Sequence, residues 1–120
     1  MNFASIFKSE PTRQTFSAGE ILIRQGESND KMFIISGELE VKVGGKAAAV
    51  LKEGDLFGEL SMIDKEPASG DVVALTDGEF VTLDERRFLS VSQQNPFFTI
   101  GILRVVTAKL RAMNQTVAGA

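Results

Sequence analysis

Two short runs of residues carry the chemistry that this sequence offers. The first run is Phe57-Gly58-Glu59-Leu60-Ser61, and the second is Pro67-Ala68-Ser69-Gly70. A glycine lets a ligand approach the backbone closely, and the neighbouring carboxylate accepts hydrogen bonds from hydroxyl groups. N–H groups without a partner at the start of a short helix suit an anion. Together the two runs predict a site that holds a sugar phosphate.

Several kinds of active site are excluded by composition. The chain has 120 residues and contains no histidine and no cysteine. It therefore lacks the residues for Ser-His-Asp or Cys-His nucleophiles and for Cys/His metal sites. No Asp-x-Asp-x-Asp-Gly loop for calcium is present either. We expect no catalytic residue, no metal site and no enzymatic activity.

Length and charge favour an ordinary soluble domain. The sequence is 43% hydrophobic and 24% charged, with a net charge of −3, and we expect a single domain over residues 1–120. Residues 97–120 carry three bases and no acid, namely Arg104, Lys109 and Arg111. Three spread charges are weak evidence for nucleic acid binding. No apolar run approaches the roughly 18 residues of a membrane span. We therefore predict a cytoplasmic protein without a membrane partner.

The middle of the chain is rich in predicted strands. Residues 38–43 alternate charged and apolar side chains, so one face of that strand meets water and the other meets the core. Gly44-Gly45 predicts a hairpin turn into a strand over 47–51. A second hairpin is expected between 72–75 and 80–83, and further strands over 21–23 and 32–35. Short strands with glycine turns favour an antiparallel jelly-roll barrel over about 14–84.

Helices follow the predicted barrel, over about 85–113. Asp84 suits the N-cap of a helix over 85–94, and Asn95-Pro96 suits the start of a second helix that ends near Met113. Residues spaced by three or four give the second helix an apolar face, formed by Phe98, Ile102, Val106, Leu110 and Met113. This face packs on the barrel, on a second copy of the chain, or on both.

At this stage the chain resembles a known family. The phrases that carry the resemblance are Ala18-Gly19-Glu20-Ile21-Leu22, Gln25-Gly26-Glu27, the run from Phe33 to Val41, and the run from Lys52 to Leu60. In this order and spacing they are similar to cyclic-nucleotide-binding domains of the catabolite activator protein and protein kinase A regulatory subunit type. The resemblance implies a mainly β fold, an antiparallel jelly-roll barrel with flanking α-helices. It also implies a regulatory domain with a cyclic nucleotide, cAMP or cGMP, as its ligand.

The resemblance assigns roles to the two runs. The residue that matches Glu59 binds the ribose 2′-hydroxyl, and Gly58 gives the ligand access to the backbone. The N–H groups of Leu60 and Ser61 and the hydroxyl or N–H of Ser69 face the phosphate. The expected ligand-binding set is Phe57, Gly58, Glu59, Leu60, Ser61, Ala68, Ser69 and Gly70.

One position departs from the family pattern. Where the family has a phosphate-binding arginine, this sequence has Ala68, and Asp71 stands where a small or hydroxylated residue is usual. Residues 53–71 contain six acids and one base, Lys65. A charge-assisted hydrogen bond to phosphate is worth about 1.5–3 kcal/mol, so its loss corresponds to roughly ten- to hundredfold in affinity. We expect weak or absent binding of cAMP and cGMP, and no cofactor is certain.

Three explanations for Ala68 stay open from the sequence. Another cation replaces the arginine, with Lys65, Arg104, Lys109 and Arg111 as candidates. Alternatively, the first run persists because it builds the barrel, and the chain is a ligand-free protein–protein interaction module. The third explanation is a pocket adapted to an uncharged or differently shaped ligand. We expect no direct DNA binding, because no helix-turn-helix follows the last helix, and a homodimer or a partner protein is expected to use the 96–113 helix.

Overall fold

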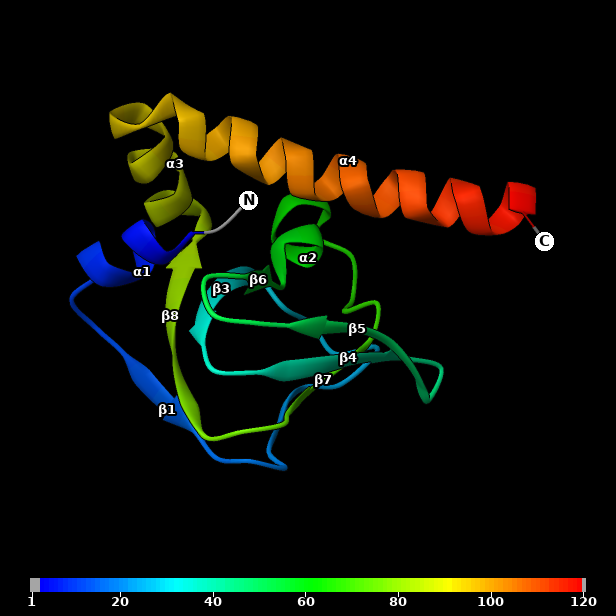
Figure 1. The fold of residues 1–120 in the computed structure, drawn as a ribbon. Helices are drawn as coiled ribbons and strands as arrows, with labels where there is room; N and C mark the ends of the chain where they lie inside the picture. Colours follow the sequence, from blue (N-terminus) through cyan, green and yellow to red (C-terminus); the bar gives the residue numbers. More distant parts are fainter. Residues whose placement is uncertain (1–2, 120) are drawn as a thin grey trace. The chain divides into compact units, whose positions relative to one another are not determined.

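The computed structural model describes residues 3–119, and their side chains as far as Gln115. These residues form two compact units, one ending at Glu85 and the other beginning at Arg86. The first unit contains all the strands (Figure 1). Its elements, in chain order, are α1 (Ala4–Ser9), β1 (Gln14–Phe16), β2 (Ile21–Ile23), β3 (Lys31–Ser36), β4 (Leu39–Val43), β5 (Lys46–Leu51), β6 (Leu56–Phe57), α2 (Glu59–Asp64), β7 (Asp71–Ala74) and β8 (Gly78–Asp84).

The strands form two antiparallel sheets of four. One sheet has the order β1-β8-β3-β6 and the other the order β2-β7-β4-β5. Their buried side chains meet in one apolar cluster, made of Phe16, Ile23, Ile35, Leu39, Phe57, Val72 and Ala74. Because both sheets contribute to this cluster, the arrangement confirms the predicted mainly β, antiparallel jelly-roll class with flanking helices.

The alternation over 38–43 has the predicted structural result. Leu39 is fully buried and Val41 packs against the apolar cluster. Between them, Glu40 points to the other face of the strand. There its carboxylate forms an ion pair with Lys42, with 3.6 Å between the carboxylate oxygen and the ammonium nitrogen. The hairpin of β4 with β5 is also present, with Leu39 opposite Leu51 and Val43 opposite Lys46.

A β-bulge interrupts the pairing of β4 with β5. Val41 is opposite Ala49 and Lys42 is opposite Ala47, so Ala48 is an extra residue on β5. β5 lies at the edge of its sheet, and its residues are exposed up to Val50. This strand therefore has a broken ladder on one side and no neighbouring strand on the other.

The predicted hairpin between 72–75 and 80–83 is wrong. β7 pairs with β2 and β4, whereas β8 pairs with β1 and β3 in the other sheet. The turn between them carries the chain from one sheet to the other. Gly78 stands at this crossing, where a Cβ atom would collide with the Ser36 carbonyl oxygen and the Phe16 ring. Both strands have alternating inward residues, so their sequence pattern did not reveal that they belong to different sheets.

The second compact unit is helical. It contains α3 (Glu85–Gln94), whose first residue still belongs to the first unit, and α4 (Pro96–Gly119). Within this unit the rings of Phe88 and Phe98 pack at 5.5 Å between centroids. α4 extends beyond the predicted end near Met113. Along its apolar face Phe98 and Ile102 are buried, whereas Leu110 and Met113 are exposed. Among the described residues, neither α4 nor any shorter helix combines the length and the hydropathy of a membrane-spanning segment.

We predict that Leu39→Ala destabilises the strand unit. Leu39 is fully buried in the cluster that joins the two sheets, so truncation removes apolar burial and leaves a cavity. The expected loss in the free energy of unfolding is about 2–5 kcal/mol, measured by urea denaturation. Val50→Ala on the exposed edge strand is the matched control. A loss for Leu39→Ala no larger than that of the control would contradict the proposed core.

Candidate functional site

Gly58 joins β6 to α2 in a conformation that favours glycine. Its φ of 79° is in the left-handed region, and it precedes the first helical residue, Glu59. A Cβ atom on Gly58 would lie 2.7 Å from the Lys31 carbonyl oxygen and 2.9 Å from the Asn29 side-chain nitrogen. The Asn29 amide donates to the carbonyl oxygens of Lys31, at 2.6 Å, and Gly58, at 3.3 Å. The first run is therefore packed directly against the segment that begins β3.

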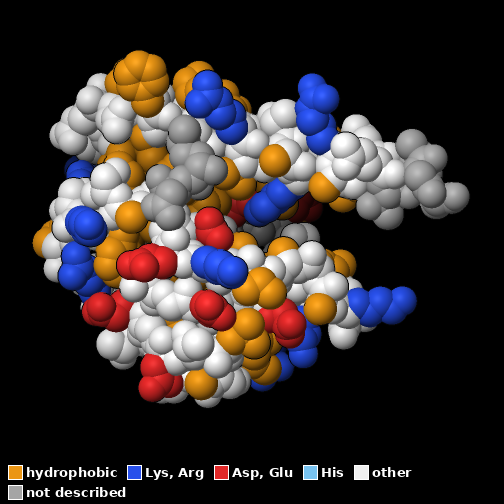
Figure 2. Space-filling model, viewed as in Figure 1, with side chains coloured by type: hydrophobic (Ala, Val, Ile, Leu, Met, Phe, Trp, Pro, Cys, Tyr) orange, Lys and Arg blue, Asp and Glu red, His pale blue; other side chains and the backbone are white. Residues whose placement is uncertain are grey.

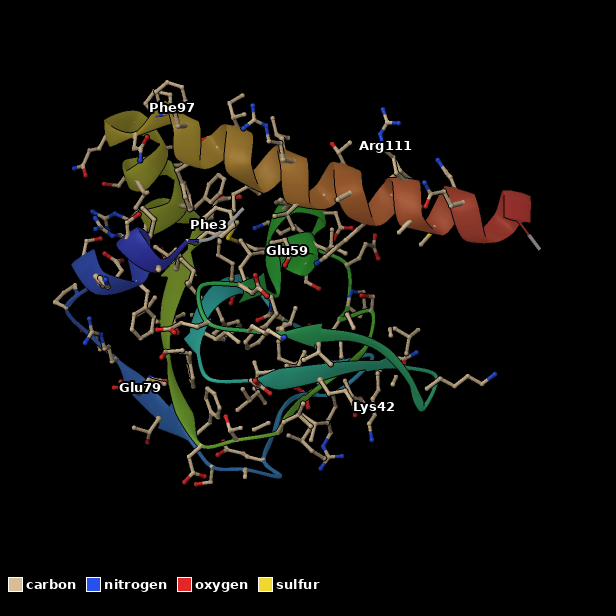
Figure 3. All side chains as sticks on the ribbon, viewed as in Figure 1. Phe3, Lys42, Glu59, Glu79, Phe97 and Arg111 are labelled. Atoms are coloured by element: carbon tan, nitrogen blue, oxygen red, sulfur yellow. The ribbon has the colours of Figure 1, made fainter. Side chains whose placement is uncertain are left out.

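Glu59 lies at the start of α2 (Figure 3). It is almost fully buried, with 1% of its surface exposed. Its neighbours Phe57 and Ser61 are also buried, and Leu60 is half-buried. A carboxylate in such a place needs hydrogen-bond donors, since burial without them is costly. This half of the expected site thus turns its polar groups toward the interior.

Ala68 is held by a reciprocal pair of backbone hydrogen bonds. Its N–H donates to the Glu27 carbonyl oxygen at 2.8 Å, and its own carbonyl oxygen accepts from the Gly26 N–H at 2.9 Å. Its side chain packs against the apolar cluster. Both backbone polar groups of Ala68 are therefore committed to the turn after β2.

The residues after Ala68 differ in exposure. Ser69 is exposed, whereas Gly70 is buried. A Cβ atom on Gly70 would lie 2.6 Å from the Lys42 carbonyl oxygen and 3.1 Å from a Val43 methyl group. Gly70 is thus needed for the close passage of this loop along β4.

Asp71 links three loops at this end of the sheet. One of its carboxylate oxygens accepts the Gln25 N–H at 2.6 Å. The Gln25 side-chain oxygen in turn accepts the Gly44 N–H at 2.9 Å. We call the segment Phe57–Gly70 the cassette. The negative charge of Asp71, directly after the cassette, therefore has a structural role, since it ties the turn after β2 to the start of β7.

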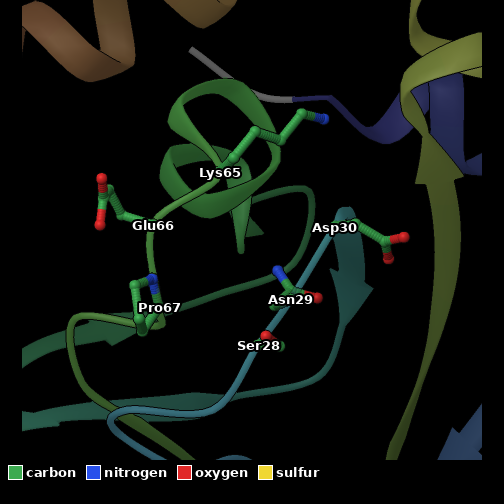
Figure 4. A pocket seen from close by; sticks show the side chains of 6 residues that line it. All are labelled: Ser28, Asn29, Asp30, Lys65, Glu66 and Pro67. Carbon is green, nitrogen blue, oxygen red and sulfur yellow. The ribbon is translucent and has the colours of Figure 1, made fainter.

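Lys65, the base closest in sequence to Ala68, is engaged elsewhere. Its ammonium nitrogen lies 3.2 Å from a carboxylate oxygen of Glu85. Among the described residues, Lys65 is the one non-glycine residue with a left-handed backbone conformation, at a φ of 62°. In Figure 4 its side chain extends away from Pro67. The other candidate cations, Arg104, Lys109 and Arg111, belong to α4 in the second compact unit.

A pocket of about 420 Å³ lies between two loops of the strand unit (Figure 4). The segments that line it are residues 28–30, which precede β3, and residues 65–67, which follow α2. None of the eight expected ligand-binding residues lines this pocket, although Pro67 directly precedes Ala68. Sequence reasoning missed residues 28–30, because only the tertiary bonds of Gly26, Glu27 and Asn29 bring them to the cassette.

Charges of both signs are interspersed over the strand unit on the face shown in Figure 2. That face therefore lacks the continuous basic surface typical of nucleic acid binding. Among the described residues, no group of histidine, cysteine, aspartate and glutamate is arranged to hold a metal ion.

Comparison with known proteins identifies similar domains. The family model described as a cyclic nucleotide-binding domain matches residues 13–95. A CRP-like cAMP-activated global transcriptional regulator of Mycobacterium tuberculosis is 30% identical over 111 residues, covering 86% of this chain and 49% of the relative. A cGMP-dependent protein kinase of Toxoplasma gondii is 34% identical over 62 residues, covering 51% of this chain and 6% of the kinase. The chain thus spans less than half the length of these relatives.

Solved structures with a similar fold include the following two. The Thermus thermophilus catabolite activator protein matches with a TM-score of 0.80 at 24% identity, over 95% of this chain and 55% of that protein. A cAMP-bound PfPKA-R structure matches with a TM-score of 0.75 at 27% identity, over 87% of this chain and 36% of that one. Both likenesses support the two-sheet fold described above.

We predict that Gly58→Ala destabilises the strand unit. The substitution places a Cβ atom against the Lys31 backbone and imposes a left-handed conformation on alanine. The free energy of unfolding is expected to fall by more than about 1 kcal/mol in urea denaturation. Gly45→Ala, also at positive φ but with nothing within 4 Å of its Cβ, separates the two costs. Equal losses in the two variants would argue against close packing at Gly58.

We also predict that Asp71→Ala destabilises the strand unit by about 1–3 kcal/mol, because the Gln25 N–H loses its charged acceptor. Thermal and urea unfolding measure the change. Asp30→Ala serves as the control, since Asp30 forms only an exposed ion pair with Lys31, and it is expected to change stability by less than about 0.5 kcal/mol. If both variants unfolded alike, Asp71 would not link the loops as described.

Proposed function

Because the chain belongs to the cyclic nucleotide-binding domain family, we propose that it acts as a ligand-regulated sensor domain whose ligand-binding residues belong to the cassette, Phe57–Gly70. The fold is that of a cyclic-nucleotide-binding regulatory domain. The observation that carries the proposal is the ribose half of the cassette, where Gly58 turns the chain into α2 and Glu59 is buried at the helix start. The proposed ligand-binding set is the one expected from the sequence: Phe57, Gly58, Glu59, Leu60, Ser61, Ala68, Ser69 and Gly70.

Binding of cAMP or cGMP is proposed to be weak or absent. Ala68 supplies no charge, and both of its backbone groups bond to the turn after β2. Lys65 forms an ion pair with Glu85, and the side chains of the two residues are 55% and 60% exposed. An exposed pair of this kind is worth about 0–1 kcal/mol. Lys65 could therefore leave Glu85 at little cost. Its ammonium group would then have to move from the C-terminal end of α2 to the loop that contains Ala68, where the resemblance places the phosphate.

The output of the sensor is proposed to pass through the helices after β8. A ligand that binds one conformation better than another shifts the balance between them. We propose that filling the pocket changes how α4 contacts a second copy of this chain or a partner protein. The exposed apolar side chains of α4 support such a contact, namely Phe97, Ile100, Leu103, Leu110 and Met113. Catalysis by the chain itself, direct DNA contact and a membrane partner form no part of the proposal, and the location we propose is the cytoplasm.

The alternative function is a ligand-free interaction module on the same fold. Ala68 favours it, because a cassette without the phosphate-binding cation still closes through backbone bonds to Gly26 and Glu27. In that case α4 would serve as a fixed docking surface. Ligand binding distinguishes the two functions.

We predict that Ala68→Arg increases affinity for cAMP or cGMP by roughly ten- to hundredfold, because it restores a charge-assisted bond to phosphate. Isothermal titration calorimetry of the wild-type chain and the variant measures the change. The wild-type chain has no tryptophan and no tyrosine, so a nucleotide carried through purification would also appear as a 260 nm absorbance band. Tight wild-type binding that needs neither Arg104 nor Lys109 would contradict our interpretation of the pocket. Absence of any gain in a folded Ala68→Arg variant would favour the interaction module.

A further inference from the structure

We infer that α4 presents a docking surface for an acidic amphipathic helix of a partner protein. The inference deepens the proposed function, on which it rests, because it names the class of partner for the proposed output contact. It follows from two observations on the helical unit. The charges of this unit are all of one sign, and exposed leucines of α4 stand in a row beside exposed arginines.

The charge of the chain divides at the boundary between the two compact units. Residues 86–120 contain five bases and no acid, whereas all 16 acids lie in residues 1–85, together with eight bases. The five bases are Arg86, Arg87, Arg104, Lys109 and Arg111. A surface of one sign attracts a partner of the opposite sign and repels a surface like itself. The helical unit therefore favours an acidic partner.

Two arginines and a phenylalanine form what we call the basic row of α4. Arg104 and Arg111 are seven residues apart, so they share one side of the helix, about 10 Å from each other along its axis. Both are exposed, and neither forms an ion pair with a described residue. Phe97, seven residues before Arg104, continues the row and is 79% exposed. Figure 3 shows Phe97 and Arg111 on the same side of α4. The basic row is thus open to the carboxylates of a partner.

An apolar row runs beside the basic row. It consists of Leu103 and Leu110, which are also seven residues apart and are both exposed. Ile100, likewise exposed, lies between the two rows, because it is three residues before Leu103 and four before Arg104. A partner that lies along α4 here buries apolar surface on one side of the contact and meets positive charge on the other.

The spacing within the two rows indicates the shape of the partner. Side chains seven residues apart share a face on a second helix as well, so a helix packed along α4 meets both rows at successive contacts. The side chains of an extended strand alternate with a period of two and do not match this spacing. A second copy of α4 supplies leucines, but it brings three further bases and no acid to the contact. A helix with leucines beside glutamates or aspartates complements both rows.

The test uses the full chain and a synthetic helical peptide of leucine, alanine and glutamate, in which leucine and glutamate each recur every seven residues. Binding to the fluorescein-labelled peptide is measured by fluorescence anisotropy and is expected to weaken as the salt concentration rises. Arg104→Gln/Arg111→Gln should weaken binding about fivefold, the effect of two exposed ion pairs. Lys46→Gln/Arg86→Gln is the matched control, because it removes the same charge from exposed positions outside both rows. It should change the affinity less than about twofold.

A second peptide, with glutamine in place of every glutamate, isolates the contribution of charge. It should bind the wild-type chain about fivefold more weakly than the acidic peptide and should not respond to Arg104→Gln/Arg111→Gln. Leu103→Ala should weaken binding of both peptides, because the apolar contact does not depend on charge. The substituted side chains are exposed, so the circular dichroism spectra of the variants should match that of the wild-type chain.

Four results would overturn the inference. The first is no binding of the acidic peptide, and the second is equal binding of the two peptides. The third is self-association of the wild-type chain, measured by analytical ultracentrifugation, that Leu103→Ala abolishes, since a second copy would then occupy the surface. The fourth is tighter binding of anionic vesicles or duplex DNA than of the acidic peptide.

The inference and the proposed function fail in different measurements. None of the four results concerns the cassette, so the sensor function would stand and would still be judged by titration with cAMP and cGMP. A chain that bound the acidic peptide as expected, but gained no affinity for either nucleotide in a folded Ala68→Arg variant, would uphold the docking surface and favour the interaction module.

Discussion

The contact between the backbone of Gly58 and the carbonyl of Lys31 is the constraint on which the cassette depends. β6 pairs with β3 through only two residues, Leu56 and Phe57, before the chain turns into α2. The turn passes so close to β3 that only a hydrogen fits where other residues have a Cβ atom. Asn29 bridges the two carbonyl groups at this point. The position of Glu59 is therefore fixed by packing within the barrel, before any ligand is considered.

The other end of the cassette is held by groups that do not depend on the identity of the side chain at position 68. The hydrogen bonds of Ala68 to Gly26 and Glu27 use backbone atoms only. The Asp71–Gln25–Gly44 chain adds a second tie between the same loops. An arginine could thus be exchanged for alanine here without loss of the loop conformation. The conformation of this loop is therefore independent of the charge that the side chain at position 68 carries.

Sequence reasoning was most successful where a local pattern has one structural solution. The alternation over 38–43 predicted β4 and its hairpin with β5, and the jelly-roll class followed. It was wrong for β7 and β8, because alternation shows which side chains face inward but not which sheet receives the strand. It missed the pocket at residues 28–30, since that pocket depends on tertiary bonds. The roles of the eight cassette residues in binding stay predictions, because a motif gives residue types and not the ligand.

The bulge at Ala48 has a consequence for how this protein behaves at high concentration. β5 is an edge strand whose residues 47–51 carry no charge and no proline, the composition that invites strand addition by another molecule. An extra residue in the middle of the strand breaks the even spacing of N–H and C=O groups that an incoming strand would need. Lys46 and Lys52, one at each end, add repulsion between identical edges. The irregular backbone and the two lysines therefore both oppose pairing between the β5 edges of two copies of the chain.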